Sequence, residues 1–510
     1  MKTVTLSSPK GKWILASAVL TSSMAFIDGT ALNVVLPSLQ KNLGASGSDL
    51  FWILNAYLVM LASLMLIGGS LGDRLGHKKV FMYGTAIFII GSAACGLSAN
   101  AFHLILFRLL QGAGGAFMIP GSLSIISSSI NSDERGKAIG TWSSFTTLVT
   151  LGGPVLGGAL ADIGLWRYIF FINVPIGIVA LLILWRHVNE PLPAKNRPPL
   201  DILGAVAIGS ALALITYGVL SSTSTGHNRW VSPVLLAAGI ILVFVFILVE
   251  HRSDHPMMPL SLFSNISFSG ANLLTFFLYA ALSCGMLFLS LDLVQIQGYS
   301  QLQSGLAFLP FTLLVLSFAG YAGRLADKYG SRWFLTCGPF TSGIGLLLLS
   351  LQGQTNGPAD YWTTFLPGMI IFGLGMAFTV APLTSTVMGA VSAEYSGVAS
   401  GINNAITRIA NVLAYAMLGA FAVIIFSKSL NSQISTIPLS AVEKTQVLEQ
   451  VGNLGNAKVP AAIRPTLKPI VTRAFHLSFI DAFKLLLRCA AMLVFSGGLI
   501  AFFTIRQTKS

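Results

Sequence analysis

Fourteen apolar runs of membrane-spanning length constrain this chain more than any other feature. A helix that crosses a bilayer needs about 20 predominantly apolar residues. Only 9% of the 510 residues are charged, whereas about a quarter are charged in a soluble domain. We therefore expect an all-α integral membrane protein with fourteen transmembrane helices. The runs cover residues 13–37, 50–71, 79–99, 102–128, 138–161, 166–186, 200–221, 231–250, 268–291, 304–323, 333–352, 362–386, 398–426 and 481–505.

A short charged turn occurs twice, first at residues 69–79 and again, in altered form, at 323–332. Two copies of one turn in so apolar a chain indicate a duplicated membrane bundle. If the seventh and eighth runs are an insertion, the two turns occupy equivalent positions in two halves. The predicted organisation is an N-terminal six-helix bundle over 1–189, a linker and inserted helix pair over 190–252, and a C-terminal six-helix bundle over 253–510 that includes a long outer loop, 427–480.

Basic residues follow the side of the membrane on which each loop lies. The formal net charge is +13. With the N-terminus inside, seventeen basic residues fall in inner segments, whereas the short outer loops hold only Lys41, Arg167 and Arg229. The long outer loop is largely exempt from this rule because long translocated segments are insensitive to charge. We predict that both termini are cytoplasmic and that the basic excess reflects topology rather than nucleic-acid binding.

Two charged residues, Asp28 and Arg108, stand inside apolar runs. Their distances from the outer ends of the first and fourth runs correspond to depths of roughly 14 and 9 Å, so the side chains could meet. Each costs about 2.5–3.5 kcal/mol on the insertion scale. Burial favours a protonated acid and a nearby guanidinium favours the carboxylate, so a conformational cycle could load and release a proton. Alternatively, Asp28 caps an irregular turn and Arg108 ties down backbone carbonyls.

Other polar residues in the second half leave two interpretations open. Asn404, Arg408 and Asn411 form one helical stripe, which lines a cavity or makes an interhelical hydrogen-bonding seam. Asp292, near the outer end of the ninth run, is an extra proton or cation site or is solvated at the membrane interface beside Gln297.

The fifth run contains a glycine-rich segment. Gly153, Gly157 and Gly158 lie on adjoining helix faces and allow close backbone approach, while Pro154 removes a donor and bends the helix. Such a helix can seal one side of a cavity, although ordinary small-residue packing explains the same pattern.

The repeated turn carries an aspartate and a glycine in both copies. Gly76 and Gly330 permit the tight reversal, and Asp73 and Asp327 can accept from helix-terminal amides or pair with basic neighbours. A purely topological role for the basic residues does not explain the two equivalent aspartates.

These motifs resemble those of the major facilitator superfamily and, within it, the fourteen-span drug:proton antiporter group. Residues 69–79 resemble its cytoplasmic loop motif, and residues 27–37 resemble its first-helix signature. Residues 108–114 resemble the fourth-helix R-x-x-Q-G-x-G signature. Residues 153–158 match the core of the antiporter motif, although Val149 stands where that motif has an earlier glycine.

The resemblance implies a proton-coupled antiporter that exports a hydrophobic or amphiphilic compound by alternating access, with a cytoplasmic latch at the repeated turns. The proton-coupling candidates are Asp28 and Arg108. Further cavity or coupling candidates are Asp292, Asn33, Gln111, Asn404 and Arg408. The cytoplasmic gate candidates are Gly69, Asp73, Arg74, Gly76, Asp327, Gly330 and Arg332. The antiporter-motif residues are Gly153, Pro154, Gly157 and Gly158.

Three alternatives remain: a dedicated exporter or flippase of a lipid or natural product, a membrane enzyme, and a sensor. The sequence has no P-loop, HExxH or convincing nucleophile triad, so we expect no enzyme activity. Its cysteines and histidines show no ligand spacing, so we expect no metal and no cofactor. The expected partners are a small hydrophobic or amphiphilic molecule, protons and the lipid bilayer of a bacterial-type inner membrane; a periplasmic adaptor is left open.

Overall fold

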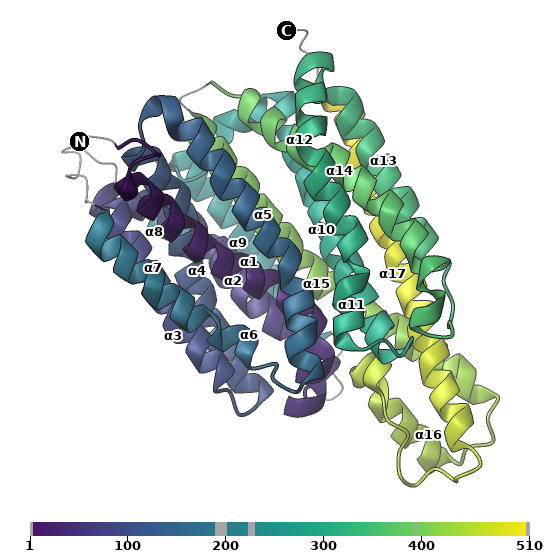
Figure 1. The fold of residues 1–510 in the computed structure, drawn as a ribbon. Helices are drawn as coiled ribbons and strands as arrows, with labels where there is room; N and C mark the ends of the chain where they lie inside the picture. The colour runs from purple at the N-terminus through teal and green to yellow at the C-terminus, as the bar shows by residue number, and fades with distance from the viewer. Residues whose placement is uncertain (1–3, 189–200, 223–229, 255, 393–394, 506–510) are drawn as a thin grey trace.

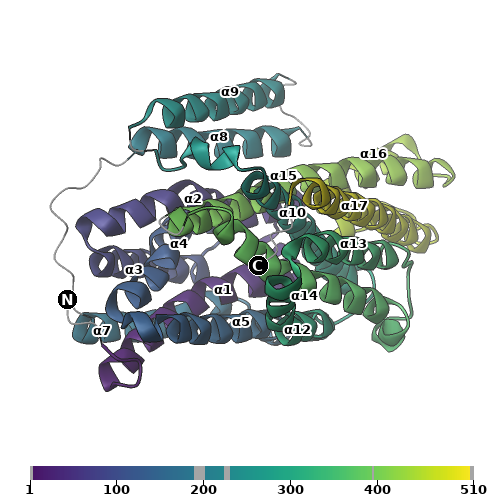
Figure 2. The same cartoon turned by 90° about the horizontal axis from the view of Figure 1, so that it is seen from above.

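The chain folds into two helical bundles (Figure 1) and an additional helix pair (Figure 2). The computed structural model describes residues 4–188, 201–222, 230–254, 256–392 and 395–505. Within these ranges the β-structure is limited to an isolated bridge between Val4 and Ile130. The linker expected before the inserted helix pair lies outside the described residues.

All fourteen predicted spans are helical. Twelve helical segments of the described chain are long and apolar enough to cross a membrane, and α5 and α13 supply the other two spans. The first bundle contains α1 (Pro9–Leu43), α2 (Gly47–Leu75), α3 (His77–Gly96), α4 (Ala101–Ser129), α5 (Ser132–Asp162), α6 (Tyr168–Phe171) and α7 (Asn173–His187). The pair is α8 (Ile202–Ser221) and α9 (Val231–Arg252).

The second bundle repeats this arrangement with longer helices at its C-terminal side. It contains α10 (Ile266–Gln295), α11 (Gln301–Ala307), α12 (Leu309–Tyr329), α13 (Ser331–Leu349), α14 (Phe365–Gly389), α15 (Ser396–Ser435), α16 (Ala441–Leu448) and α17 (Lys468–Thr504). Short 3-10 helices cover Leu260–Ser264, Pro358–Trp362 and Glu449–Asn456.

The molecule has two distinct ends. We call the end at which α1 begins and α17 finishes the termini end, and the opposite end, where α16 lies, the far end (Figure 1). The bundles meet along α2 and α15, along α5 and α11, and along α1 and α10. These contacts place any site between the bundles close to α1, α2, α5, α10, α11 and α15.

The repeated turn has one backbone geometry in both copies. Gly76 has φ 100° and ψ 131°, and Gly330 has φ 89° and ψ 144°. Residues other than glycine rarely adopt this backbone conformation. In each copy the glycine N–H donates to the carbonyl four residues earlier, at 3.0 Å for Gly72 and 2.8 Å for Ala326. Each glycine therefore ends one long helix and starts the next, so the two turns share one local geometry.

The inserted pair lies against the outside of the two bundles rather than within either (Figure 2). Helix α8 packs on α2 and α15, the seam between the bundles, while α9 packs on α8. The apolar stretch of α9 has a mean hydropathy of 2.9, yet only 11% of it is buried within the protein. So apolar and so exposed a helix is suited to contact with lipid.

The predicted outer loop 427–480 overlaps helices at both of its ends. Helix α15 continues to Ser435 and α17 begins at Lys468, so residues 436–467 connect these two helices. Residues 470–479 form the first turns of α17. Its Phe475 and Phe479 are buried in the protein core.

Candidate functional site

A buried polar network joins α1 to α4. Asp28 and Arg108 are each 1% exposed, and Arg108 Nη1 lies 2.5 Å from Asp28 Oδ2. Gln111 Nε2 donates to Asp28 Oδ1 at 2.9 Å, and its Oε1 accepts from Arg108 Nη1 at 2.8 Å. Arg108 Nε donates to the Ile53 carbonyl at 3.2 Å, and its guanidinium lies 4.3 Å from the centre of the Tyr57 ring. Asp28 and Arg108, expected to meet from their depths alone, form a pair that Gln111 completes.

The glycines of the 108–114 segment bring neighbouring helices close enough to build this network. A Cβ at Gly112 would collide with the Tyr57 carbonyl of α2, and a Cβ at Gly114 would collide with the Phe88 amide of α3. The Arg and Gln therefore supply the polar groups, and the two glycines position α2 and α3 around them.

A cavity of about 480 Å³ lies between the two bundles. Its walls come from α1, α2, α4, α5, α10, α14 and α15, with further residues from the α11–α12 segment. Arg108 lines this cavity, whereas Asp28 does not and is screened by its partners. Trp142, Met388 and Ser400 line it near the termini ends of α5, α14 and α15, so the cavity extends toward the termini end.

The polar face of α15 both lines the cavity and forms an interhelical hydrogen-bonding seam, which are the two interpretations that the sequence left open. Asn411 Oδ1 accepts from the Ser283 hydroxyl at 2.8 Å, and the nearby Asn403 Nδ2 donates to Asn272 Oδ1 at 3.1 Å and to Thr275 Oγ1 at 2.7 Å, so α15 forms a seam with α10. Asn404 and Arg408 line the cavity. The seam thus holds the helix in place while its neighbouring residues face the open space.

On α1, the predicted residue Asn33 also lines the cavity. Its Oδ1 atom is buried and has no hydrogen-bond partner. A buried acceptor without a partner is unfavourable, so this oxygen is available to a ligand donor.

The glycine-rich segment of α5 makes contact with both bundles. Gly157 faces the backbone of Ala31 on α1, and Gly158 faces the backbone of Gln301 on α11; a Cβ at either position would collide with these atoms. Pro154 lines the cavity, and a Cβ at Gly305 of α11 would collide with its carbonyl. The segment therefore permits the close approach of the bundles that closes the far end.

A carboxylate at the C-terminal end of α5 strengthens this closure. Asp162 accepts from the Ser300 hydroxyl at 2.7 Å, from the Gln301 N–H at 2.7 Å and from the Leu302 N–H at 3.0 Å. These donors are at the start of α11, where a helix favours negative charge. Gln295 of α10 also donates to Gln40 of α1 at 3.0 Å, so the far end is closed by polar contacts between the bundles.

At the termini end, the described residues of the second repeated turn face solvent or their own bundle. Asp327 is exposed, and the Arg332 guanidinium lies 4.5 Å from the centre of the Phe502 ring within its own bundle. Gly69, Asp73 and Arg74 lie in α2, but their side chains are outside the described part of the chain.

The family model for the Major Facilitator Superfamily matches residues 18–415. The chain belongs to that superfamily. The transporter is 29% identical over 499 residues to the tetracenomycin C resistance and export protein of Streptomyces glaucescens, covering 96% of this chain and 91% of that protein. It is 33% identical over 418 residues to the methylenomycin A resistance protein of Bacillus subtilis (strain 168), covering 81% and 88%.

Solved structures show the same fold. A bacterial homolog of the human lysosomal transporter Spinster, in an inward-facing and unoccupied conformation, has a TM-score of 0.66 at 18% identity, covering 98% of this chain and 99% of that one. An auto-inhibited peptide transporter of the POT family has a TM-score of 0.65 at 15% identity, with 98% of each chain covered. The transporter therefore shares a multi-pass helical architecture with proteins of very different sequence.

Asp292 occupies a different place from the solvated interface considered in the sequence analysis. It is fully buried, its Oδ2 accepts from Gln297 Nε2 at 3.1 Å, and its Oδ1 has no hydrogen-bond partner. Gln297 Nε2 also donates to the Gly353 carbonyl at 3.0 Å, and Gln297 Oε1 accepts from the Thr355 N–H at 2.9 Å. The interface interpretation is wrong because the segment between α13 and α14 covers the end of α10, and Asp292 does not line the central cavity.

Several residues of the network were missed by sequence reasoning. Ser92 of α3 accepts from Gln111 Nε2 at 3.3 Å and from Asn173 Nδ2 at 3.0 Å, and donates to the Phe170 carbonyl at 2.8 Å. An asparagine within the apolar sixth run was the available signal for Asn173.

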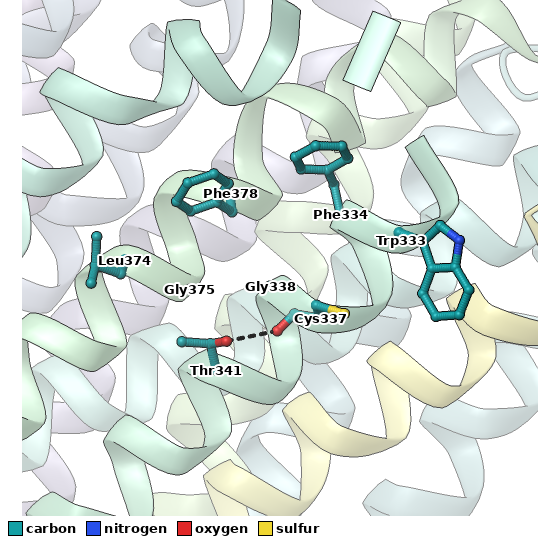
Figure 3. Close-up of a pocket in the computed structure, with 8 residues that line it drawn as sticks. All are labelled: Trp333, Phe334, Cys337, Gly338, Thr341, Leu374, Gly375 and Phe378. Atoms are coloured by element: carbon teal, nitrogen blue, oxygen red, sulfur yellow. Dashed lines mark hydrogen bonds between the residues drawn. The ribbon is translucent and has the colours of Figure 1, made fainter. Parts of the chain in front are cut away.

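A second recess, of about 380 Å³, lies between α13 and α14 (Figure 3). Trp333, Phe334, Leu374 and Phe378 line it, and its hydrogen bond from Thr341 Oγ1 to the Cys337 carbonyl at 2.9 Å stays within α13. The described lining has no charged residue, so the central cavity is the stronger candidate for the functional site.

Proposed function

We propose that the transporter is a proton-coupled antiporter that exports a hydrophobic or amphiphilic small molecule by alternating access. The observation that carries this proposal is the buried Asp28–Arg108–Gln111 network against a cavity closed at one end. The relatives whose names refer to export and drug resistance support an export direction. The charge distribution supports a bacterial-type inner membrane location with cytoplasmic termini.

With that orientation, the far end is the outer side and this conformation is inward-facing. The two bundles, proposed over 1–189 and 253–510, rock around the cavity. Asp162 and the glycines of α5 hold the outer side shut, and the repeated turns with Asp73, Arg74, Asp327 and Arg332 close the inner side in the opposite conformation.

Asp28 is the residue that exchanges the coupling proton in this mechanism. In the paired state, Arg108 and Gln111 satisfy both carboxylate oxygens, and the Arg108 guanidinium supplies the counter-charge. A movement of α4 relative to α1 that separates the pair leaves a buried carboxylate without a counter-charge, and such a group takes up a proton. Proton binding and release are thereby tied to the arrangement of the helices that form the cavity.

A two-stage experiment tests this proposal. Growth of bacteria that express the protein, in a panel of hydrophobic and amphiphilic toxic compounds, identifies a substrate through protection that the Asp28→Asn variant does not give. In proteoliposomes, that substrate should drive proton movement with the wild type and none with Asp28→Asn. Asp481→Asn serves as the matched control and should retain transport. The Asp481 carboxylate is exposed and accepts a hydrogen bond from the Ser429 hydroxyl. Unchanged proton flux in Asp28→Asn, with the variant folded, refutes the assignment.

A further inference from the structure

We propose that the exported molecule carries a negative charge, a carboxylate, sulfonate or similar acidic group, which Arg408 binds in the central cavity. This inference rests on the proposed export function and specifies its substrate class. It follows from the charge balance of the cavity wall.

The charged side chains among the described cavity residues are both arginines, Arg108 and Arg408. Arg108 is neutralised by Asp28 at 2.5 Å. Arg408 forms no ion pair within the described part of the chain, and its Nε atom is buried with no hydrogen-bond partner. The described wall therefore carries one uncompensated positive charge.

A guanidinium with a buried, unsatisfied donor is an unfavourable arrangement until an acceptor pairs with that donor. The Arg408 side chain is half-buried, and burial of its Nε donor costs free energy unless that donor is hydrogen-bonded. Arginine presents donors in a planar fork that matches carboxylate-like groups bidentately. A ligand anion supplies the charge and the acceptors that the described wall lacks, whereas a cationic ligand adds a second uncompensated positive charge.

The remaining wall indicates the other part of the substrate. Tyr57, Tyr279 and Tyr415 present aromatic rings from three helices, and Trp142 and Phe311 add two more. Rings of this kind pack against flat apolar bodies. The volume of about 480 Å³ lies within the range of drug-sized sites. The combination fits an aromatic amphiphile with an anionic head group.

Two pairs of permanently or fully charged probes test this charge preference. The first pair is naphthalene-2-sulfonate and trimethyl(2-naphthyl)ammonium, and the second is fluorescein and rhodamine 123 at a pH at which fluorescein is ionised. The two members of each pair share a ring system and carry charges of opposite sign. Equilibrium binding to the detergent-solubilised full chain is measured without a proton gradient, so failure of proton coupling does not affect the result.

The anion of at least one pair should bind at least tenfold more tightly than its cation. Arg408→Gln should weaken anion binding by about 10- to 100-fold, which is the range for loss of a hydrogen bond to a charged group. Arg408→Lys should keep part of the affinity because the charge remains, and Arg408→Glu should reverse the preference. Arg473→Gln, an exposed arginine in the far-end part of α17, should bind as the wild type does.

Preference of the wild type for the cations, absence of anion binding in both pairs, or unchanged anion affinity in a folded Arg408→Gln overturns the proposal. The wild-type preference alone remains decisive if a variant does not fold. Anion binding with no substrate-driven proton movement would preserve this inference and refute the coupling mechanism instead.

Discussion

Arg108 and Arg408 line the same cavity in opposite electrostatic situations. Arg108, on α4, is 1% exposed and satisfied by Asp28, Gln111 and the Ile53 carbonyl. Arg408, on α15, forms no ion pair with a described residue and has a buried Nε without a partner. Two residues of the same type can therefore have different roles in one cavity, because each role depends on the partners of the side chain. We assign the paired arginine to coupling and the unpaired one to substrate.

The largest expected contrast is in stability. Arg108→Gln leaves Asp28 as a buried carboxylate without its counter-charge, and breaking a buried pair in this way costs about 3–5 kcal/mol. Arg408→Gln removes an unpaired charge and should change the unfolding free energy by about 1 kcal/mol or less. Unfolding of both variants by SDS in mixed micelles measures the difference.

A double variant sharpens this contrast. Asp28→Asn combined with Arg108→Gln removes both charges, so its loss of stability should be smaller than the sum of the two single losses. Equal stability losses for Arg108→Gln and Arg408→Gln would mean that the two arginines do not differ in the proposed way.

An intermediate effect is expected at the outer closure. Gly158→Val places side-chain atoms against the Gln301 backbone, and overpacking of this kind costs about 1–3 kcal/mol. The equilibrium should shift toward the outward-open state. Labelling of a cysteine introduced at Asn33 by an impermeant maleimide added outside should therefore become faster. Gly152→Ala, where a Cβ meets nothing within 4 Å, is the control and should leave the rate unchanged. Slower labelling in Gly158→Val contradicts the proposed closure.

The smallest effect is expected for Asp162→Asn. The amide oxygen still accepts one or two of the bonds from the start of α11, but the negative charge at that helix N-terminus is lost, a change worth about 0.3–1 kcal/mol. The same cysteine assay should show a modest acceleration, below that of Gly158→Val. An effect larger than that of Gly158→Val would mean that the carboxylate, rather than the glycine packing, controls the outer side.

The helices and the paired arginine were predictable from sequence because their signals are local. Apolar runs specify the spans, and the glycines at 76 and 330 specify the two equivalent turns. Asp28 and Arg108 were matched by depth, since a buried charge in a membrane needs a partner and few were available.

The remaining features depend on contacts between distant segments. Asp162 stands at the end of a helix, and no neighbouring residue in the sequence identifies its partners. Its carboxylate nevertheless accepts hydrogen bonds from residues 138 to 140 positions away. Asp292 also stands at a helix end, and only the packing of the segment at 350–357 reveals that it is buried. The stripe with Arg408 allowed two interpretations because helical periodicity defines a face but does not identify its neighbour.

Two transport assays on one proteoliposome preparation test whether Asp28 exchanges the coupling proton while Arg408 binds the substrate. Naphthalene-2-sulfonate is followed first by counterflow without a proton gradient and then by accumulation under an imposed gradient. We predict that Asp28→Asn retains counterflow but loses gradient-driven accumulation, whereas Arg408→Gln loses both. Accumulation by Asp28→Asn at the wild-type level, or intact counterflow of the sulfonate in Arg408→Gln, would contradict the account.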